Sequence, residues 1–340
     1  MSETQFYIHN KPFKTELGET LNELKIAYTI LGKINKKASN VVWICHAFTA
    51  DANPEAWWPG MVGKDKLFSP DKYLIVCANI LGSPYGSTSP LSINSETETP
   101  YFRDFPRLTV RDMVEAHLIL AKYLTINQIY LMVGGSIGGF QAIEWAIIKP
   151  KMIHRLVLIA TNAKTSPWRI AHNATQRMII EADKSYYNNT LRGGINGMKA
   201  ARAMALLSYR NAQAYNITQS ENLSDKTKDF RADSYQRYQG EKFSKRFNAY
   251  CYYTLLNMLD THDIGRKRGG QERALGRIKA KTLLVKIDSD ILFWSEEMEF
   301  MDTYIFDSKL KTIHSDFGHD GFLLEHQQIS ALLNDFIMTD

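Results

Sequence analysis

Residues 131–140 read LMVGGSIGGF, and this stretch decides the fold. The apolar run Ile129–Val133 predicts a buried strand, and the run Phe140–Ile148 predicts a helix. Ser136 lies at the turn between them, with two glycines on each side. Side chains at the flanking positions would collide with the strand or the helix, so the pattern predicts a strained turn that lifts the serine hydroxyl clear of the sheet. We interpret Ser136 as a nucleophile at a helix N-terminus, where free N–H groups stabilise negative charge.

This stretch has two alternative interpretations, a phosphate-binding loop of the Walker or dinucleotide type and a glycine-rich turn. A phosphate-binding Walker loop requires a lysine followed by Ser or Thr after its last glycine, whereas Phe140 and Gln141 follow here. The dinucleotide pattern G-x-G-x-x-G is absent from the stretch. A glycine-rich turn with a chance serine is the remaining alternative. The nucleophile hypothesis requires an acid and then a histidine further along the chain.

Composition limits the class of protein. Of the 340 residues, 44% are hydrophobic and 23% are charged, as is usual for a soluble globular enzyme. The net charge of +5 has no long basic run behind it, which argues against a nucleic-acid partner. Three distant cysteines are typical of reduced core residues in a cytoplasmic protein. We expect no signal peptide and no membrane span, because no long uncharged apolar run is present.

Strand and helix patterns alternate along most of the chain, which predicts a mainly parallel sheet covered by helices on both faces. An antiparallel pair is expected at the start, from residues 6–17 and 24–31. Further strands are predicted at 41–45, 73–79, 128–134, 155–160, 281–287 and 310–314, and helices at 109–124, 140–148, from Ser295, and at 322–337. The first of these helices opens on a capping box, Thr109 to Asp112.

The pattern changes between residues 165 and 274, where the chain is polar, aromatic and helical in period. We interpret this segment as a helical lid inserted into a core made of residues 1–164 and 275–340. The basic run Arg266-Lys267-Arg268 falls within it and is interpreted as a turn of the lid.

An acid and a histidine follow Ser136 in the required order. Asp288 and Asp290 both come after the predicted strand 281–287, and Asp290 is preferred because the apolar residues after it would bury and fix its carboxylate. A solvated turn acid is the alternative. His319 lies in a short glycine-containing loop before the last helix. Ser136, Asp290 and His319 together would perform acyl transfer, with His319 as the base.

Acyl transfer also needs donors for the developing oxyanion. We expect these to be the backbone N–H groups of Ile137, directly after the nucleophile, and of Phe48, in the loop after strand 41–45. His46, at the end of that strand, would shape this loop. His262 has no partner at metal-ligand spacing, and the sequence predicts no metal site.

Several motifs together resemble the homoserine O-acetyltransferase family, which has an α/β-hydrolase fold, over residues 6–336. They are GGSIGG at 134–139, QAIEWA at 141–146, GST at 86–88, DFP at 104–106, TVRDM at 109–113, YQGEKF at 238–243, DSD at 288–290 and GHD at 318–320. The resemblance implies transfer of an acetyl group from acetyl-CoA, as co-substrate without a bound cofactor, to the hydroxyl of L-homoserine. It also implies a ping-pong route under the lid, a role in methionine biosynthesis, and a homodimer formed through the lid.

The resemblance also implies three substrate contacts. Arg202 would bind the carboxylate with Tyr209 beside it, and Asp320 would bind the amine. Arg202 and Tyr209 are seven residues apart and so share a helix face, and arginine suits a carboxylate; a solvated lid arginine is the alternative. Departures from the family pattern on the acyl side, at Ile137, Ala50 and Ser83-Pro84, leave open a succinyl-CoA donor. L-serine as acceptor and a plain esterase or thioesterase also stay open, and the basic run at Arg266 would alternatively contact the phosphates of CoA.

Overall fold

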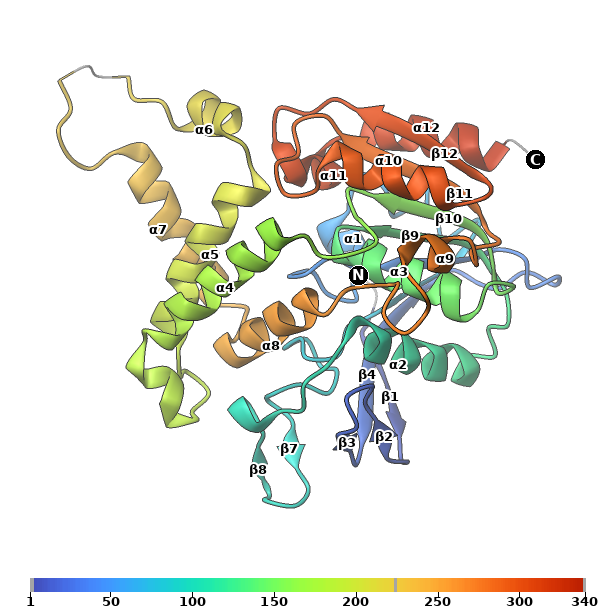
Figure 1. Ribbon diagram of the computed structural model, residues 1–340, viewed down its shortest axis with the longest axis horizontal. Helices are drawn as coiled ribbons and strands as arrows, with labels where there is room; N and C mark the ends of the chain where they lie inside the picture. The colour runs from blue at the N-terminus through green and yellow to red at the C-terminus, as the bar shows by residue number, and fades with distance from the viewer. Residues whose placement is uncertain (1–2, 223–224, 339–340) are drawn as a thin grey trace.

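An eight-stranded sheet forms the centre of the molecule (Figure 1). The structure is a computed structural model, and it describes residues 3–222 and 225–338. The strands run in the spatial order β1 (Gln5–His9), β4 (Leu24–Leu31), β6 (Leu74–Ala78), β5 (Val41–Cys45), β9 (Ile129–Gly135), β10 (Ile153–Ile159), β11 (Lys281–Ile287) and β12 (Ser308–Ile313). The six from β6 to β12 are parallel, while β4 is antiparallel to both β1 and β6.

The central strands are buried on both faces, as continuous apolar runs predict. In β5, Trp43 belongs to the apolar cluster on one face of the sheet, and Val42 and Ile44 belong to the cluster on the other face. The first cluster takes in α2 (Val110–Tyr123), α3 (Ile137–Ile148) and α10 (Ser295–Tyr304). The second takes in α12 (His326–Met338) and the segment after α1 (Pro54–Trp57). The predicted α/β architecture with covered faces is therefore confirmed.

Several predicted elements lie where the sequence places them. The helix α2 begins after Thr109, whose side chain accepts a hydrogen bond from the Asp112 N–H, while Asp112 accepts from the Thr109 N–H at 2.7 Å. This reciprocal arrangement is the capping box that the sequence predicts. The strand β11 and the start of α10 at Ser295 also agree with the prediction.

The chain differs from the prediction near both ends. The first strand stops at His9, and the following residues instead form a separate two-stranded sheet of β2 (Phe13–Lys14) and β3 (Thr20–Leu21). The helix predicted over 322–337 is broken into α11 (Gly321–Leu324) and α12, because Glu325 has a backbone conformation outside the helical region (φ −84°, ψ 43°). The remaining small elements are β7 (Ile93–Asn94), β8 (Thr99–Pro100) and 3-10 helices at Phe102–Asp104, Lys184–Asn188 and Gly318–Asp320.

Helices fill the segment between β10 and β11. They are α4 (Pro167–Glu181), α5 (Ile195–Tyr209), α6 (Ala212–Gln219), α7 (Arg231–Ser244), α8 (Ala249–Asp260) and α9 (Gln271–Leu275). The helices α4 to α8 lie together to one side of the sheet, beyond the ends of its strands in Figure 1, whereas α9 packs against α10. In the ranges 3–222 and 225–338, no helix is both long and apolar enough to cross a membrane.

Candidate active site

Ser136 occupies the sharp turn between β9 and α3. Its backbone has φ 55° and ψ −125°, a strained conformation for a residue with a side chain. The turn is held by the Ser136 N–H, which donates to the Ile159 carbonyl at 2.9 Å, and by the Thr161 hydroxyl, which donates to the Ser136 carbonyl at 2.8 Å. A Cβ atom on Gly138 would lie 2.1 Å from the Cys45 carbonyl oxygen. Glycine is therefore required there for α3 to approach β5.

Asp290 and His319 are joined by a buried hydrogen bond. The Nδ1 atom of His319 lies 2.7 Å from Oδ2 of Asp290. The other carboxylate oxygen accepts the backbone N–H groups of Leu292 at 2.8 Å and of Phe293 at 3.0 Å. The carboxylate is thus fixed on both sides, and it orients the imidazole so that Nε2 is left for another partner.

Asp288, the competing acid, has other partners. Its carboxylate lies 2.6 Å from Nδ1 of His314 and accepts the Ser315 N–H at 3.2 Å. It joins the ends of β11 and β12 and lies outside the site, as the preference for Asp290 implies.

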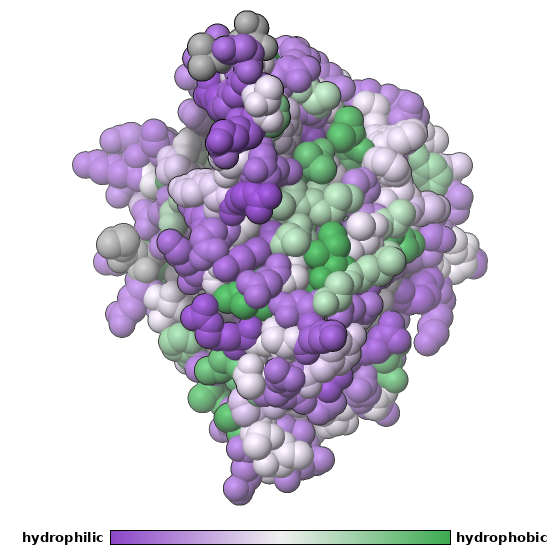
Figure 2. All heavy atoms as spheres, turned by 90° about the vertical axis from the view of Figure 1, so that its left-hand side faces the viewer, coloured by the Kyte–Doolittle hydropathy of each residue, from purple (hydrophilic) through white to green (hydrophobic). Residues whose placement is uncertain are grey.

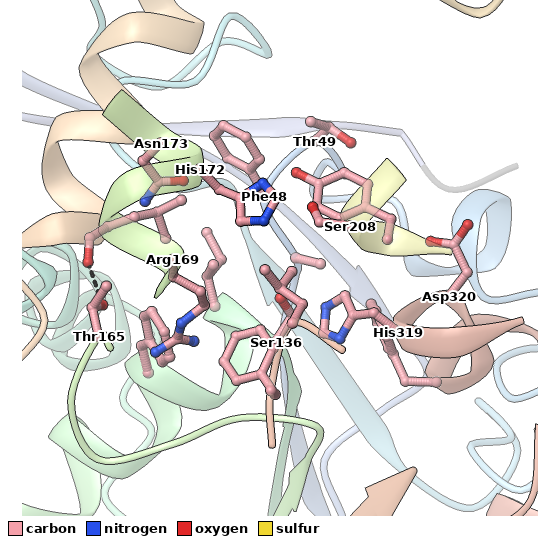
Figure 3. A pocket seen from close by; sticks show the side chains of 18 of the residues that line it. Phe48, Thr49, Ser136, Thr165, Arg169, His172, Asn173, Ser208, His319 and Asp320 are labelled. Carbon is pink, nitrogen blue, oxygen red and sulfur yellow. Dashed lines mark hydrogen bonds between the residues drawn. The ribbon is translucent and has the colours of Figure 1, made fainter. Parts of the chain in front are cut away.

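Ser136 and His319 line one cavity, together with residues of α4 and α5. Figure 3 shows the imidazole of His319 next to Ser136, with Asp320 beyond it. Arg202, Tyr209 and Asp320 also line this cavity, together with Phe48 and Ile137. The structure therefore brings together all the residues that the sequence proposes for the site, with Asp290 behind His319.

Two residues that line the cavity with Ser136 have backbone N–H groups without a partner among the described residues. In the part of the chain that the structure describes, the backbone N–H groups of Phe48 and Ile137 donate to no other group. The loop that carries Phe48 is fixed by His46, whose Nδ1 lies 2.8 Å from the Ala47 carbonyl and whose Nε2 accepts the Ile80 N–H at 3.0 Å. Burial lowers the pKa of His46, so its ring is neutral, as these two hydrogen bonds require.

One side of the cavity carries opposite charges, from Arg202 and Asp320. The guanidinium of Arg202 lies 5.2 Å from the centre of the Tyr209 ring, and its Nη1 atom is buried without a partner among the described residues. Burial raises the pKa of Tyr209, so its hydroxyl stays protonated and can donate. Arg210 was missed by sequence reasoning: its Nε atom lies 3.2 Å from Oδ2 of Asp320.

A second wall of the cavity was also missed. It is formed by one face of α4, through the polar side chains Arg169, His172, Asn173 and Gln176. His172, Asn173 and Gln176 follow Arg169 by three, four and seven residues, which is the spacing of one helix face. That spacing was present in the sequence and could have identified the wall.

The basic run at residues 266–268 lies away from the cavity. Arg266 forms an ion pair with Glu16, its Nη2 atom 2.7 Å from the carboxylate, and Arg268 forms one with Glu144. Both arginines are therefore engaged within the protein, and the alternative that this run contacts the phosphates of CoA is not supported.

Within residues 3–222 and 225–338, no group of three or more His, Cys, Asp or Glu side chains is arranged to hold a metal ion. The buried His262 instead stacks on Phe140, with ring centres 3.7 Å apart, and contacts the Asn162 carbonyl at 2.8 Å. Burial lowers the pKa of His262 to about 3, so this histidine is a neutral part of the core.

Comparison with known proteins agrees with this geometry. A family model described as the alpha/beta hydrolase fold matches residues 40–326. The chain therefore belongs to the α/β-hydrolase fold family, a class defined by this sheet and by a nucleophile on the turn after its central strand.

A narrower family follows from individual relatives. A homoserine O-acetyltransferase from Cyclobacterium marinum is 43% identical over 338 residues, which cover 99% of this chain and 96% of the relative. A homoserine O-acetyltransferase structure from Bacillus anthracis superposes with a TM-score of 0.92 at 22% identity, covering 100% and 98% of the two chains. The structure of esterase E22 has a TM-score of 0.90 at 23% identity, covering 99% and 100%. Within the hydrolase fold, this chain belongs to the homoserine O-acetyltransferase family.

Proposed function

We propose that this protein transfers an acetyl group from acetyl-CoA to the hydroxyl of L-homoserine through an acyl-enzyme on Ser136. The observation that carries the proposal is the pairing of charges beside the nucleophile. Arg202 and Asp320 line the same cavity as Ser136 and His319, and the Nη1 atom of Arg202 has no partner among the described residues. A simple esterase has no need of a cation and an anion at this place, whereas a zwitterionic acceptor requires both.

The first half of the reaction loads the enzyme. His319 Nε2 removes the proton of the Ser136 hydroxyl as Oγ attacks the thioester carbonyl, and Asp290 stabilises the resulting imidazolium through Nδ1–H. The N–H groups of Phe48 and Ile137 stabilise the oxyanion. The C–S bond then breaks, the imidazolium gives its proton to the departing sulfur, and CoA leaves as the free thiol.

The second half reverses these roles. The homoserine hydroxyl gives its proton to His319 and attacks the Ser136 ester, whose bond to Oγ breaks after the tetrahedral intermediate. Ser136 recovers its proton from the imidazolium. Arg202 binds the acceptor carboxylate, with the hydroxyl of Tyr209 beside it, and Asp320 binds the ammonium. Arg210 holds the Asp320 carboxylate in place.

The direct test follows release of free thiol from acetyl-CoA. We expect a rate that depends on homoserine and is lost in Ser136→Ala. Thiol release in buffer alone would assign a hydrolase instead, a faster rate with succinyl-CoA would change the donor, and a faster rate with L-serine would change the acceptor.

A matched pair of variants tests whether Arg202 binds the carboxylate of the acceptor. Arg202→Met should raise the KM for homoserine by about 10- to 100-fold, as expected for a lost charge-assisted contact, and should leave the initial burst of thiol release unchanged. Lys199→Met removes a cation from the same helix, where Lys199 is paired with Glu241 at 2.6 Å, and should leave both quantities unchanged. A burst that falls in Arg202→Met would contradict the assignment of Arg202 to the acceptor.

We also propose that residues 165–274 act as a lid over the core and that two copies associate through it. The proposal is supported by the exposed apolar side chains Ile170 and Met178 on α4, Leu207 on α5 and Ile217 on α6. Figure 2 shows apolar side chains gathered among polar ones on the side of the molecule where the lid lies. Sedimentation should give the mass of a dimer, and Met178→Glu should shift it toward the monomer.

The proposed setting is the cytoplasm and the proposed pathway is methionine biosynthesis. Cys45, Cys77 and Cys251 are free and buried, and burial raises the pKa of each thiol. Such thiols are unreactive core residues and fit a reducing compartment. Fractionation of cells that produce the protein would test the location.

A further inference from the structure

Arg169, on the first turn of α4, carries a buried charge that no ion pair neutralises. The residue is 5% exposed, and its Nη2 atom donates to the Lys164 carbonyl at 3.2 Å. Its Nε and Nη1 atoms have no partner, and no carboxylate of residues 3–222 or 225–338 forms an ion pair with it. Burial lowers the pKa of Arg169 to about 10, so the side chain is still a cation at neutral pH.

The guanidinium instead contacts an aromatic ring that belongs to the active site. It lies 3.9 Å from the centre of the Phe293 ring. The Phe293 ring stacks on the imidazole of His319, with centres 4.9 Å apart and planes 17° apart. The backbone N–H of Phe293 also donates to Asp290. Phe293 therefore links a cation of the lid to both the base and the acid.

We propose that Arg169 is a positioning residue that acts through Phe293 on His319. It holds the ring of Phe293 against the imidazole by a cation–π contact, and its positive charge repels the positive charge that the imidazole takes up with the serine proton. Figure 3 shows Arg169 and His319 on two sides of Ser136. The proposal rests on the function proposed above, in which His319 is the base.

Other charges also face His319 and set the background for this effect. Asp290 contacts the Nδ1 atom of His319, and the centre of the Tyr209 ring lies 6.2 Å from the centre of the imidazole. The remaining charged groups near them are Asp320 with its partner Arg210, Arg202 beside Tyr209, and Glu297, Asp290 and Asp260 around Arg169. Substituting Arg169 leaves all of these in place, so a change in pH dependence reports the guanidinium.

The test is the pH profile of Ser136 acylation, measured as the burst of p-nitrophenol from p-nitrophenyl acetate. The acid limb is the part of this profile where the acylation rate falls as the pH is lowered. Losing the cation favours protonation of the base, so the acid limb of Arg169→Met should move to higher pH by about half a unit. Arg169→Lys keeps the charge, and its limb should stay at the wild-type position while the burst rate falls a few-fold. Arg169→Gln is a second neutral variant if the methionine variant does not fold.

A control separates this effect from a general loss of charge on α4. Arg177 lies on the same helix, with Nη1 2.7 Å from Asp260, and Arg177→Met should leave the acid limb unchanged. An unchanged limb in Arg169→Met, or an equal movement in the methionine and lysine variants, would overturn the proposal. The burst needs no homoserine, so it distinguishes this proposal from the identity of the acceptor. A wild-type protein that neither the ester nor acetyl-CoA acylates would overturn both.

Discussion

Asp288 and Asp290 are two residues apart and have the same side chain, yet they have different partners. Asp290 is bonded to the buried His319, and Asp288 to the exposed His314. Asp290→Asn would present an amide to Nδ1 and favour the wrong imidazole tautomer, so we expect acylation to slow by about 10⁴-fold. Asp288→Asn should acylate at close to the wild-type rate. Burst kinetics of both variants measure the acylation rate. An equal fall in this rate in the two variants would show that the catalytic acid was wrongly assigned to Asp290.

Gly138 is a position where a single added Cβ atom should destabilise the fold. A Cβ atom there would meet the Cys45 carbonyl oxygen at 2.1 Å, and neither backbone segment can move without opening the contact of α3 with β5. Gly138→Ala should therefore lower the free energy of unfolding by about 2–3 kcal/mol or more. Gly276 is the control, because its φ is −62° and the nearest atom to an added Cβ lies 3.5 Å away. Gly276→Ala should be neutral or stabilising by up to about 1 kcal/mol, and urea denaturation compares the two.

At the scale of elements, one ion pair joins the ends of β11 and β12. The hydrogen bond that His314 donates to the Asp288 carboxylate raises the pKa of His314. For Asp288, burial acts to raise the pKa, but the hydrogen bonds from His314 and Ser315 outweigh it and lower the pKa. Because the pKa of His314 is raised, its contribution to stability is complete at pH values below the ordinary histidine pKa of about 6.5. Because the pKa of Asp288 is lowered, its contribution is complete at pH values above the ordinary aspartate pKa of about 3.9. The pair therefore stabilises the fold most between about pH 4 and 6.5.

The prediction is a pH-dependent melting temperature. The contribution of the pair should be lost as the pH rises through the raised pKa of His314, and again as it falls through the lowered pKa of Asp288. His314→Gln should remove the loss on the alkaline side without changing acylation. A wild-type melting temperature as flat as that of the variant above pH 6 would show that this pair does not stabilise the fold.

Local pattern was enough to predict most strands and helices. The buried run of β11 and the capping box of α2 are read from neighbouring residues, and the structure places both as predicted. The break at Glu325 was missed because the residues on both sides of it are good helix formers and only the backbone conformation of one residue separates α11 from α12. The end of β1 at His9 was missed because an alternating pattern continues past it into a different small sheet.

The candidate site was predictable where a motif carries it and not where folding alone creates it. Ser136 and His319 lie in glycine-containing motifs, and their placement in one cavity was expected from the sequence. The pairing of Arg210 with Asp320 joins residues 110 positions apart, and the contact of Arg169 with Phe293 likewise depends on how α4 packs on the loop after β11. Neither contact leaves a local pattern. The catalytic roles themselves stay predictions until the acylation experiments are done.

At the scale of the whole molecule, a network of charges fastens residues 266–268, near the end of the proposed lid segment, to the core. Glu144 of α3 binds Arg111 of α2, with Nε 3.1 Å from Oε1, and binds Arg268. Arg111 also binds Glu16, which in turn binds Arg266. The side chain of Glu144 is 2% exposed, so this carboxylate neutralises two largely buried guanidinium groups. The network joins four segments that are distant in sequence, and it fixes where the chain returns from the lid to the sheet.

Because both arginines would lose their shared partner, Glu144→Gln should be far more destabilising than its small change in shape implies. Removing one member of a buried pair costs about 3–5 kcal/mol, since the remaining charge stays buried without compensation. Asp233→Asn is the matched control, because its pair with Arg237 is exposed on both sides and such pairs contribute little. Urea denaturation should show a large fall in the free energy of unfolding for the first variant and none for the second. If the two variants unfolded at the same urea concentration, the network would be a consequence of the fold and not one of the contacts that hold the lid segment to it.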